Sequence, residues 1–292
     1  MPNPLIPELS SGRVSVDALM RQPTLIRDRI AKLADDQILL PRLLKPYGVR
    51  VVGGGILHSV IKAADYFTAD RLEARAPSAE YPVIRATDPD SKLALVNDFG
   101  GRVQLADEDI TRADIAKVDA AAIQLANEIT KSLDLRTIAA IEAAGLQSVA
   151  VSTPWQNVVT VGPETALTPS SARPAASWAV ADELMALQEL GNKPDILIVH
   201  PSQKRALAVA YGENLDAVLK SAGLTLFANP RLTDGIGYVT QAGAAGFVGF
   251  EEPLTVEIVP DRLTRSRWVQ AFCVPAFAIT NPGAVIKLTG LS

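Results

Sequence analysis

One long amphipathic segment constrains this chain more than any other feature of its sequence. From about residue 109 to residue 144, apolar positions recur every three or four residues, which places them on one stripe of a helix. These positions are Ile115, Val118, Ala122, Leu125, Ile129 and Leu133. At 1.5 Å per residue the helix would span roughly 50 Å, far more than one ordinary globular core needs. A helix of this length is more typical of a subunit that reaches across its neighbours than of a compact enzyme.

Signals for both ends of this helix flank the apolar stripe. Thr111 and Asp114 fit a capping box, in which side chains satisfy the free backbone N–H groups of the first turn. Gly145 stands where a C-cap glycine is expected. A strand-like stretch rich in proline and glycine precedes the helix, and a mixed α/β half follows it. The sequence therefore predicts an α+β fold organised around one spine helix.

Composition sets the broad class of the chain. Its 292 residues are 48% hydrophobic and 21% charged, which is typical of a globular protein with one large or two ordinary domains. A net charge of -4 argues against a protein whose main task is to grip nucleic-acid phosphates. The one cysteine, Cys273, fits a reducing compartment. Because we find neither a signal peptide nor an apolar stretch of the ~20 residues that a membrane span needs, we expect cytoplasmic synthesis and no membrane partner.

The first 46 residues are predicted to form an N-terminal arm. Six prolines break it into short pieces, and residues 24–33 form an amphipathic helical stretch that is too short to bury its apolar face alone. Seven basic and five acidic residues give the arm a net charge of +2 on an otherwise acidic protein. Two interpretations stay open: a solvated tail, or an arm that faces nucleic acid.

Residues 49–52 and about 65–105 are predicted to be strand-like and broken by turns. Within the longer stretch, strands are expected over residues 71–76, 81–86 and 92–96, separated by Pro- and Gly-rich turn signals. Few large apolar side chains accompany these strands, so the hairpin cannot form a core of its own. We therefore expect it to extend from the body and to lie on another chain.

The second half of the chain alternates between helical and strand-like patterns. Residues 148–161 suggest strands, and residues 163–174 suggest a loop. Helices are expected over residues 175–190 and 202–211. Strands are expected over residues 196–199, 224–228, 237–240, 246–250, 254–259, 268–274 and 285–289, with a polar tip at 260–267. The three tryptophans are interpreted as core or interface anchors.

No group of residues predicts catalysis, a cofactor or a metal. The glycine turn at residues 53–55 lacks the third glycine of a dinucleotide fingerprint, because His58 stands there. Neither His58 nor His200 has a metal-ligand companion three or four residues away. His200 is interpreted as a satisfied histidine at a strand end, and Cys273 as a small core residue.

The order of these elements resembles the major capsid proteins of tailed bacteriophages, whose fold is named for the phage Hong Kong 97. Three stretches carry the resemblance: residues 97–110 (NDFGGRVQLADEDI), residues 103–129 and residues 256–290. The resemblance covers nearly the whole chain, and its specificity lies in the order and lengths of the elements.

The resemblance implies a division of the chain into four parts. These are an N-terminal arm (1–46), a peripheral domain with the spine helix (47–61, 105–145 and 251–278), an extended hairpin or E-loop (62–104), and an axial α/β domain (146–250 and 279–292). The axial domain would meet its copies around five-fold and six-fold axes. The hairpin would lie over the neighbouring subunit.

The resemblance also implies contacts at the three-fold junctions between capsomers. The tip with Asp261, Arg262, Thr264 and Arg265 would approach these junctions. The positive charges of Arg262, Arg265 and Arg267 would repel their copies there unless acidic side chains lie close enough to pair with them. The candidate partners on the hairpin are Glu80, Asp88 and Asp90.

Some members of the family join their subunits through a Lys–Asn isopeptide bond assisted by a buried Glu. Lys92 is placed on the hairpin where the lysine would be. A register anchored on Cys273 puts Arg267 at the asparagine position and Val274 at the glutamate position. Two residues that the chemistry needs are missing, so we expect no covalent cross-linking.

The leading hypothesis is a non-catalytic major capsid protein. It would assemble as pentamers and hexamers into an icosahedral shell around double-stranded DNA, in the host cytoplasm, and reside in the virion. A separate scaffolding protein, a portal and a decoration protein are the expected partners. Two alternatives remain: an encapsulin-like nanocompartment shell, and a soluble α/β enzyme that uses His200 or the glycine turn.

Overall fold

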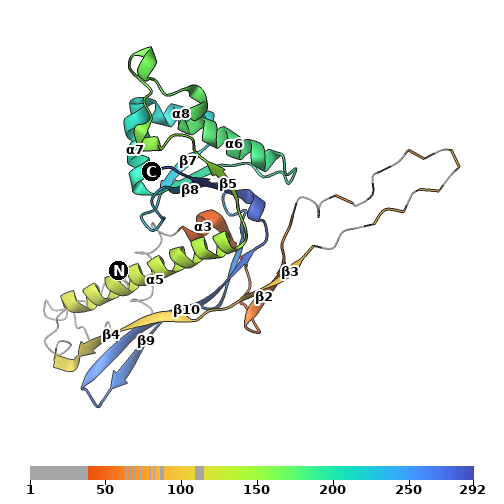
Figure 1. Ribbon diagram of the computed structural model, residues 1–292. Coiled ribbons are helices and arrows are strands. Elements are labelled where there is room, and N and C mark those ends of the chain that lie inside the picture. The colour runs from red at the N-terminus through yellow and green to blue at the C-terminus, as the bar shows by residue number, and fades with distance from the viewer. Residues whose placement is uncertain are drawn as a thin grey trace, which may run out of the picture.

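The computed structural model describes residues 39–108 and 115–292, except 63, 64, 66, 69, 71, 73, 76, 79, 82 and 86–88. Residues 1–38 of the expected arm and the expected capping box at Thr111 and Asp114 lie outside this description. In the described part, two sheets lie on either side of one long helix, and a ribbon projects from one end of the body (Figure 1).

The long helix, α5 (Ile115–Ala143), confirms the predicted spine within its described part. Its 29 residues span about 43 Å at 1.5 Å per residue. Gly145 follows with a φ of 82°, a left-handed conformation that glycine adopts without strain, and so ends the helix as expected. None of the described helices is long and apolar enough to cross a membrane.

A four-stranded sheet lies under the spine helix. Its strand order is β1 (Leu44–Pro46), β9 (Gly246–Asp261), β10 (Ser266–Ile279) and β4 (Phe99–Ala106). Strand β10 runs antiparallel to both neighbours, and β1 runs parallel to β9. The helix covers one face of this sheet, as Leu125, Ile129 and Leu133 pack into one core with β4, β9 and β10. Cys273 of β10 lies in this core, as predicted.

A five-stranded sheet forms the second lobe. Its strand order is β5 (Gln147–Ala150), β11 (Val285–Thr289), β8 (Ile236–Thr240), β6 (Ile196–Val199) and β7 (Thr225–Ala228). Helices α6 (Pro174–Ala186), α7 (Pro201–Tyr211) and α8 (Leu215–Ser221) pack on one face of this sheet. Short 3-10 turns occupy Trp155–Asn157, Glu164–Ala166, Ser170–Ala172, Gly212–Asn214 and Pro282–Ala284. Residues 151–161 therefore contain no strand, contrary to expectation.

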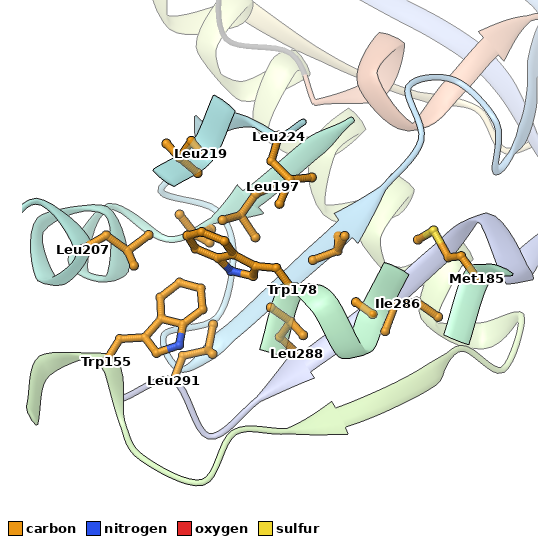
Figure 2. Packing of buried hydrophobic residues seen from close by; sticks show 13 residues of the cluster. Trp155, Trp178, Met185, Leu197, Leu207, Leu219, Leu224, Ile286, Leu288 and Leu291 are labelled. Carbon is orange, nitrogen blue, oxygen red and sulfur yellow. The ribbon is translucent and has the colours of Figure 1, made fainter. Parts of the chain in front are cut away.

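Trp155 and Trp178 lie at the centre of this helix-covered core. Figure 2 shows the two indole rings edge to face between α6, α7 and the sheet, and their centroids are 6.1 Å apart. Both side chains are buried, so the interpretation of these two tryptophans as anchors is confirmed.

The opposite face of the five-stranded sheet packs on the end of the spine helix. Successive strand residues point to opposite faces, so Leu197 and Val199 meet the helices α6–α8, whereas Ile198 meets Ile141 of α5. The short helix α3 (Leu40–Leu43) fills the space between α5 and this sheet (Figure 1).

The projecting ribbon begins with β2 (Gly55–Ser59) and β3 (Ser91–Leu95), which pair antiparallel. Where residues 71–76 and 81–86 are described, they are not strands, so these two predictions are wrong. Residues 49–52 are not a strand either, and the strand begins after the glycine turn instead. The hairpin is also shorter than residues 62–104, because residues 99–104 belong to β4 of the four-stranded sheet.

Two adjacent glycines of β4 offer a test of how closely this sheet is packed. A Cβ on Gly100 would lie 2.5 Å from the backbone oxygen of Ala271, whereas one on Gly101 would meet only Leu125, at 3.3 Å. We expect Gly100→Ala to destabilise the chain by about 1–3 kcal/mol, because β4 must shift away from β10. Gly101→Ala is the matched control and should cost much less. Chemical denaturation measures both, and equal losses would contradict the packing described.

Candidate subunit interfaces

The base of the ribbon exposes apolar side chains on one of its faces. Leu57 is directly opposite Leu93 in the β2–β3 register, and Leu95 is opposite Gly55. These three leucines are 73%, 60% and 63% exposed. The other face is covered, because Ile56 packs against Val51, Ala276 and Ala278. One face of the ribbon is thus part of the body, and the other is an uncovered apolar surface.

The apolar exposure continues outward from this base. Leu72, Tyr81 and Val83 are all more than 70% exposed, and the ribbon runs away from both lobes (Figure 1). An exposed apolar surface of this extent usually marks an interaction site. We call residues 55–95 the ribbon from here on.

Charged residues of the ribbon are partly paired within the chain. Lys62 Nζ donates to Asp90 Oδ2 over 2.6 Å, and this bond raises the pKa of Lys62 and lowers the pKa of Asp90. Glu80 and Lys92 are exposed, and neither forms an ion pair with another described residue. Asp88 lies outside the described residues.

The tip between β9 and β10 is a turn organised by Asp261. Its Oδ1 accepts the backbone N–H groups of Leu263 at 3.0 Å and Thr264 at 3.4 Å. Its Oδ2 accepts the Thr264 hydroxyl at 2.9 Å and the Trp268 indole N–H at 3.4 Å. The bond from Thr264, followed by that from Trp268, lowers the pKa of Asp261. Asp261 and Thr264 therefore hold the shape of the tip.

What the tip presents outward is one leucine between two arginines. Leu263 is 98% exposed, and Arg262 and Arg265 flank it. Arg267 is not part of this group, because it lies on β10 with its Nε 3.8 Å from Asp107 Oδ1. The expected cluster of three arginines is thus reduced to two at the tip. Periodicity and composition do not point to Leu263, although a lone leucine in a charged turn is a recognisable signal.

The histidines show no arrangement for catalysis. His200 caps α7, accepting the backbone N–H of Ser202 at Nδ1, which confirms its interpretation as a satisfied histidine. Ser202 also donates its hydroxyl to Asp234. In a catalytic triad the serine and the carboxylate lie on opposite nitrogens of the imidazole. Here Ser202 and Asp234 both lie on the Nδ1 side, so these residues form a helix cap.

Cys273 lies in the core and is not an activated thiol. Burial raises the pKa of the Cys273 thiol to about 11, so the reactive thiolate is scarce at neutral pH. No three His, Cys, Asp or Glu side chains gather to hold a metal among the described residues. The exposed apolar side chains of the ribbon and of the tip are typical of a class of proteins that make contacts with other chains.

Comparison with known proteins identifies the family within this class. The sequence model of a phage capsid protein family matches residues 89–288, more than half of the chain. The chain belongs to this phage capsid protein family. It is thus a phage capsid protein, a structural component of the virion. The sequence has no significant match among curated proteins.

Solved structures share the fold at low sequence identity. The virus-like particle from Pyrococcus furiosus is 14% identical with a TM-score of 0.63, covering 90% of this chain and 97% of that one. The structure from Mycobacterium phage Adephagia is 13% identical with a TM-score of 0.62, covering 87% and 89%. The capsid of Myoviridae phage XM1 is 12% identical with a TM-score of 0.57, covering 86% and 90%. The resemblance stated from the sequence is confirmed at the level of family and fold.

The organisation of the tip can be tested on the residue that holds it. We expect Asp261→Ala to speed amide hydrogen exchange at Leu263 and Thr264, because both N–H groups lose their acceptor. The melting temperature should change little, since the tip is exposed. Arg262→Ala is the control and leaves these bonds in place. Unchanged exchange in Asp261→Ala would show that another group holds the turn.

Proposed function

We propose that this capsid protein assembles as pentamers and hexamers into a closed shell around double-stranded DNA, without covalent cross-links between subunits. The observation that carries this proposal is the uncovered apolar face of the ribbon. A side chain such as Leu57 contributes about 1.5–3 kcal/mol when it passes from full exposure to full burial. Burial of this face against a neighbouring copy is the simplest way to gain that free energy.

The ribbon is proposed to act as the E-loop, lying over the adjacent subunit. Each subunit then gives one ribbon to a neighbour and receives one from another, which is a heterologous contact. Such contacts close into rings when the rotation between subunits divides a full circle. Many modest contacts of this kind add up to a stable shell through multivalency.

The tip is proposed to meet its copies at the three-fold junctions between capsomers. Arg262 and Arg265 repel their own copies there, so acidic side chains from other subunits must lie close to them. Glu80 and Asp88 of the ribbon remain the candidate partners. Asp90 is a weaker candidate than the sequence suggested, because Lys62 already occupies its carboxylate.

The two lobes are proposed to be the peripheral and axial domains of the family. The four-stranded sheet with α5 supports the peripheral assignment, and the five-stranded sheet with α6–α8 supports the axial one. The boundary at residue 250 moves to about residue 245, because Gly246–Asp261 is a single strand of the four-stranded sheet. The axial lobe would surround the five-fold and six-fold axes.

The proposed partners follow from the role as a shell subunit. With a net charge of -4, the inner wall would enclose DNA through weak contacts without reading its bases. A scaffolding protein would guide assembly, a portal would occupy one vertex, and a decoration protein would bind the outer surface.

A second candidate function is a nanocompartment that encloses an enzyme instead of a genome. The similarity to the virus-like particle from Pyrococcus furiosus favours this candidate, at a TM-score of 0.63 over most of both chains. The match to the phage capsid protein family favours the virion. Nuclease-protected DNA inside purified particles supports the first function, and a stoichiometric cargo enzyme supports the second.

The role of the ribbon is tested by the double variant Leu57→Ser and Leu93→Ser. We expect a folded chain that remains as free subunits, because the apolar face that drives the contact is gone. Size-exclusion chromatography and electron microscopy measure the loss of particles. Leu187→Ser is the matched control, since this leucine of the other lobe is 70% exposed. The same loss in the control, or normal shells from the double variant, would contradict the special role of the ribbon.

The absence of cross-links gives a separate prediction. Lys92 lies on β3, but Arg267 and Val274 on β10 supply neither the amide nor the carboxylate that the isopeptide chemistry needs. Mature particles boiled in detergent should therefore run as a single monomer band on a denaturing gel. A ladder of covalent oligomers that Lys92→Ala abolishes would contradict the proposal.

A further inference from the structure

The spine helix carries one fully buried carboxylate. Asp134 has 0% of its surface exposed, and both oxygens of its carboxylate accept hydrogen bonds. Oδ1 accepts the backbone N–H of Leu39 at 2.8 Å. Oδ2 accepts the side-chain amide of Asn229 at 2.8 Å and Nη1 of Arg231 at 2.6 Å. The donors therefore come from two segments, one about 95 residues before Asp134 in the sequence and one about 95 residues after it.

These bonds connect three parts of the molecule at one point. Asp134 belongs to α5, Leu39 stands just before α3, and Asn229 and Arg231 follow β7 of the five-stranded sheet. Asn229 is itself buried and accepts the backbone N–H of Arg231 at 2.8 Å, so the loop is shaped to present both donors. Helix α3 lies between α5 and this sheet in Figure 1.

The rest of the contact between α5 and the five-stranded sheet is less directional. Ile138 and Ile141 make apolar contacts, which tolerate sliding. Glu142 accepts bonds from Tyr238 at 2.8 Å and Lys287 at 2.5 Å, but its side chain is 40% exposed. Only Asp134, among the described residues of α5, combines full burial with an ion pair to this lobe.

A buried ion pair is a poor stabiliser but a good constraint on geometry. Removing two charges from water costs about as much as their attraction returns, so an apolar pair of similar volume is often equally stable. Charged hydrogen bonds, however, are directional and fix how the elements that carry them are oriented. What Asp134 adds to the apolar contact is therefore mainly a defined angle.

We propose that Asp134 is a positioning residue for shell assembly. By binding Leu39, Asn229 and Arg231 together, it sets the angle between the spine helix and the axial lobe. It also sets the place where the chain before residue 39 joins them. Every subunit then presents ribbon, tip and axial lobe in the same relative orientation, which ring closure requires. This inference rests on the proposed assembly into closed shells.

The test uses variants of the full-length chain that separate stability from geometry. Asp134→Asn keeps the shape but removes the charge, and we expect the melting temperature to fall by roughly 5–10 °C. The double variant Asp134→Leu with Arg231→Met removes both charges but leaves the buried donors of Leu39 and Asn229 without an acceptor, so it should regain only part of that loss. Thermal unfolding measures both values.

The deciding readout is the diameter distribution of the assembled particles by electron microscopy, well below each melting temperature. We expect one narrow peak for the wild type and loss of that peak in both Asp134 variants, even where stability is partly regained. Glu142→Gln is the matched control on the same helix and should keep the narrow peak. Arg231→Lys, which retains the charge, provides a milder variant and should broaden the peak less than the double variant does.

The outcomes separate this inference from the function on which it rests. A wild-type chain that forms no particles would overturn the proposed assembly and the role of Asp134 with it. Uniform wild-type particles together with equally uniform particles from the double variant would overturn only the role of Asp134. Dispersed particles from Glu142→Gln as well would also overturn it, because any contact of the helix would then act in the same way.

Discussion

The structure depends on one helix being shared by two cores. Leu125, Ile129 and Leu133 of α5 cover the four-stranded sheet, and Ile141 of the same helix packs against the five-stranded sheet. Each sheet exposes an apolar face if the helix is removed. The two lobes therefore cannot part without opening the core that Ile141 shares with the five-stranded sheet, and the length of α5 follows from the need to span both sheets.

This arrangement leaves the ribbon and the tip outside the shared core. Helix α5 covers one face of the four-stranded sheet, and α6–α8 cover one face of the five-stranded sheet, whereas Leu57 and Leu93 stay exposed. The tip also lies outside the shared core: Asp261 satisfies its turn locally, Gln104 of β4 donates to Thr264, and Leu263 is 98% exposed. A single chain thus has a closed interior and unmatched projections, which is the combination that assembly with other copies resolves.

Sequence patterns predicted the elements that have a regular apolar periodicity. They did not predict the features that depend on contacts between residues far apart in the sequence. Periodicity found α5, and a continuous apolar run found Ile196–Val199, since burial on both faces leaves that signature. Residues 71–76 and 81–86 have strand-like composition but no described partner strand, and a strand needs one. Two strands were expected over residues 246–250 and 254–259, but the structure has the single strand β9, and Pro253 is accommodated where the register with β10 shifts between Phe272 and Val274. The paired states of Asp90, Asp107 and Asp134 depend on residues far away in sequence, so no local pattern revealed them.

Assembly needs both a fixed angle between the two lobes of each subunit and an apolar surface that binds the next subunit. A heterologous contact closes into a ring only when each copy repeats the same rotation, and a flexible joint between lobes would let that rotation vary. The apolar ribbon alone specifies no angle, because apolar burial is non-directional. Directional bonds at Asp134 and Asp261, by contrast, hold the joint and the tip. In the proposed assembly, the free energy would therefore come from the leucines of the ribbon, and the geometry would come from buried or locally satisfied carboxylates.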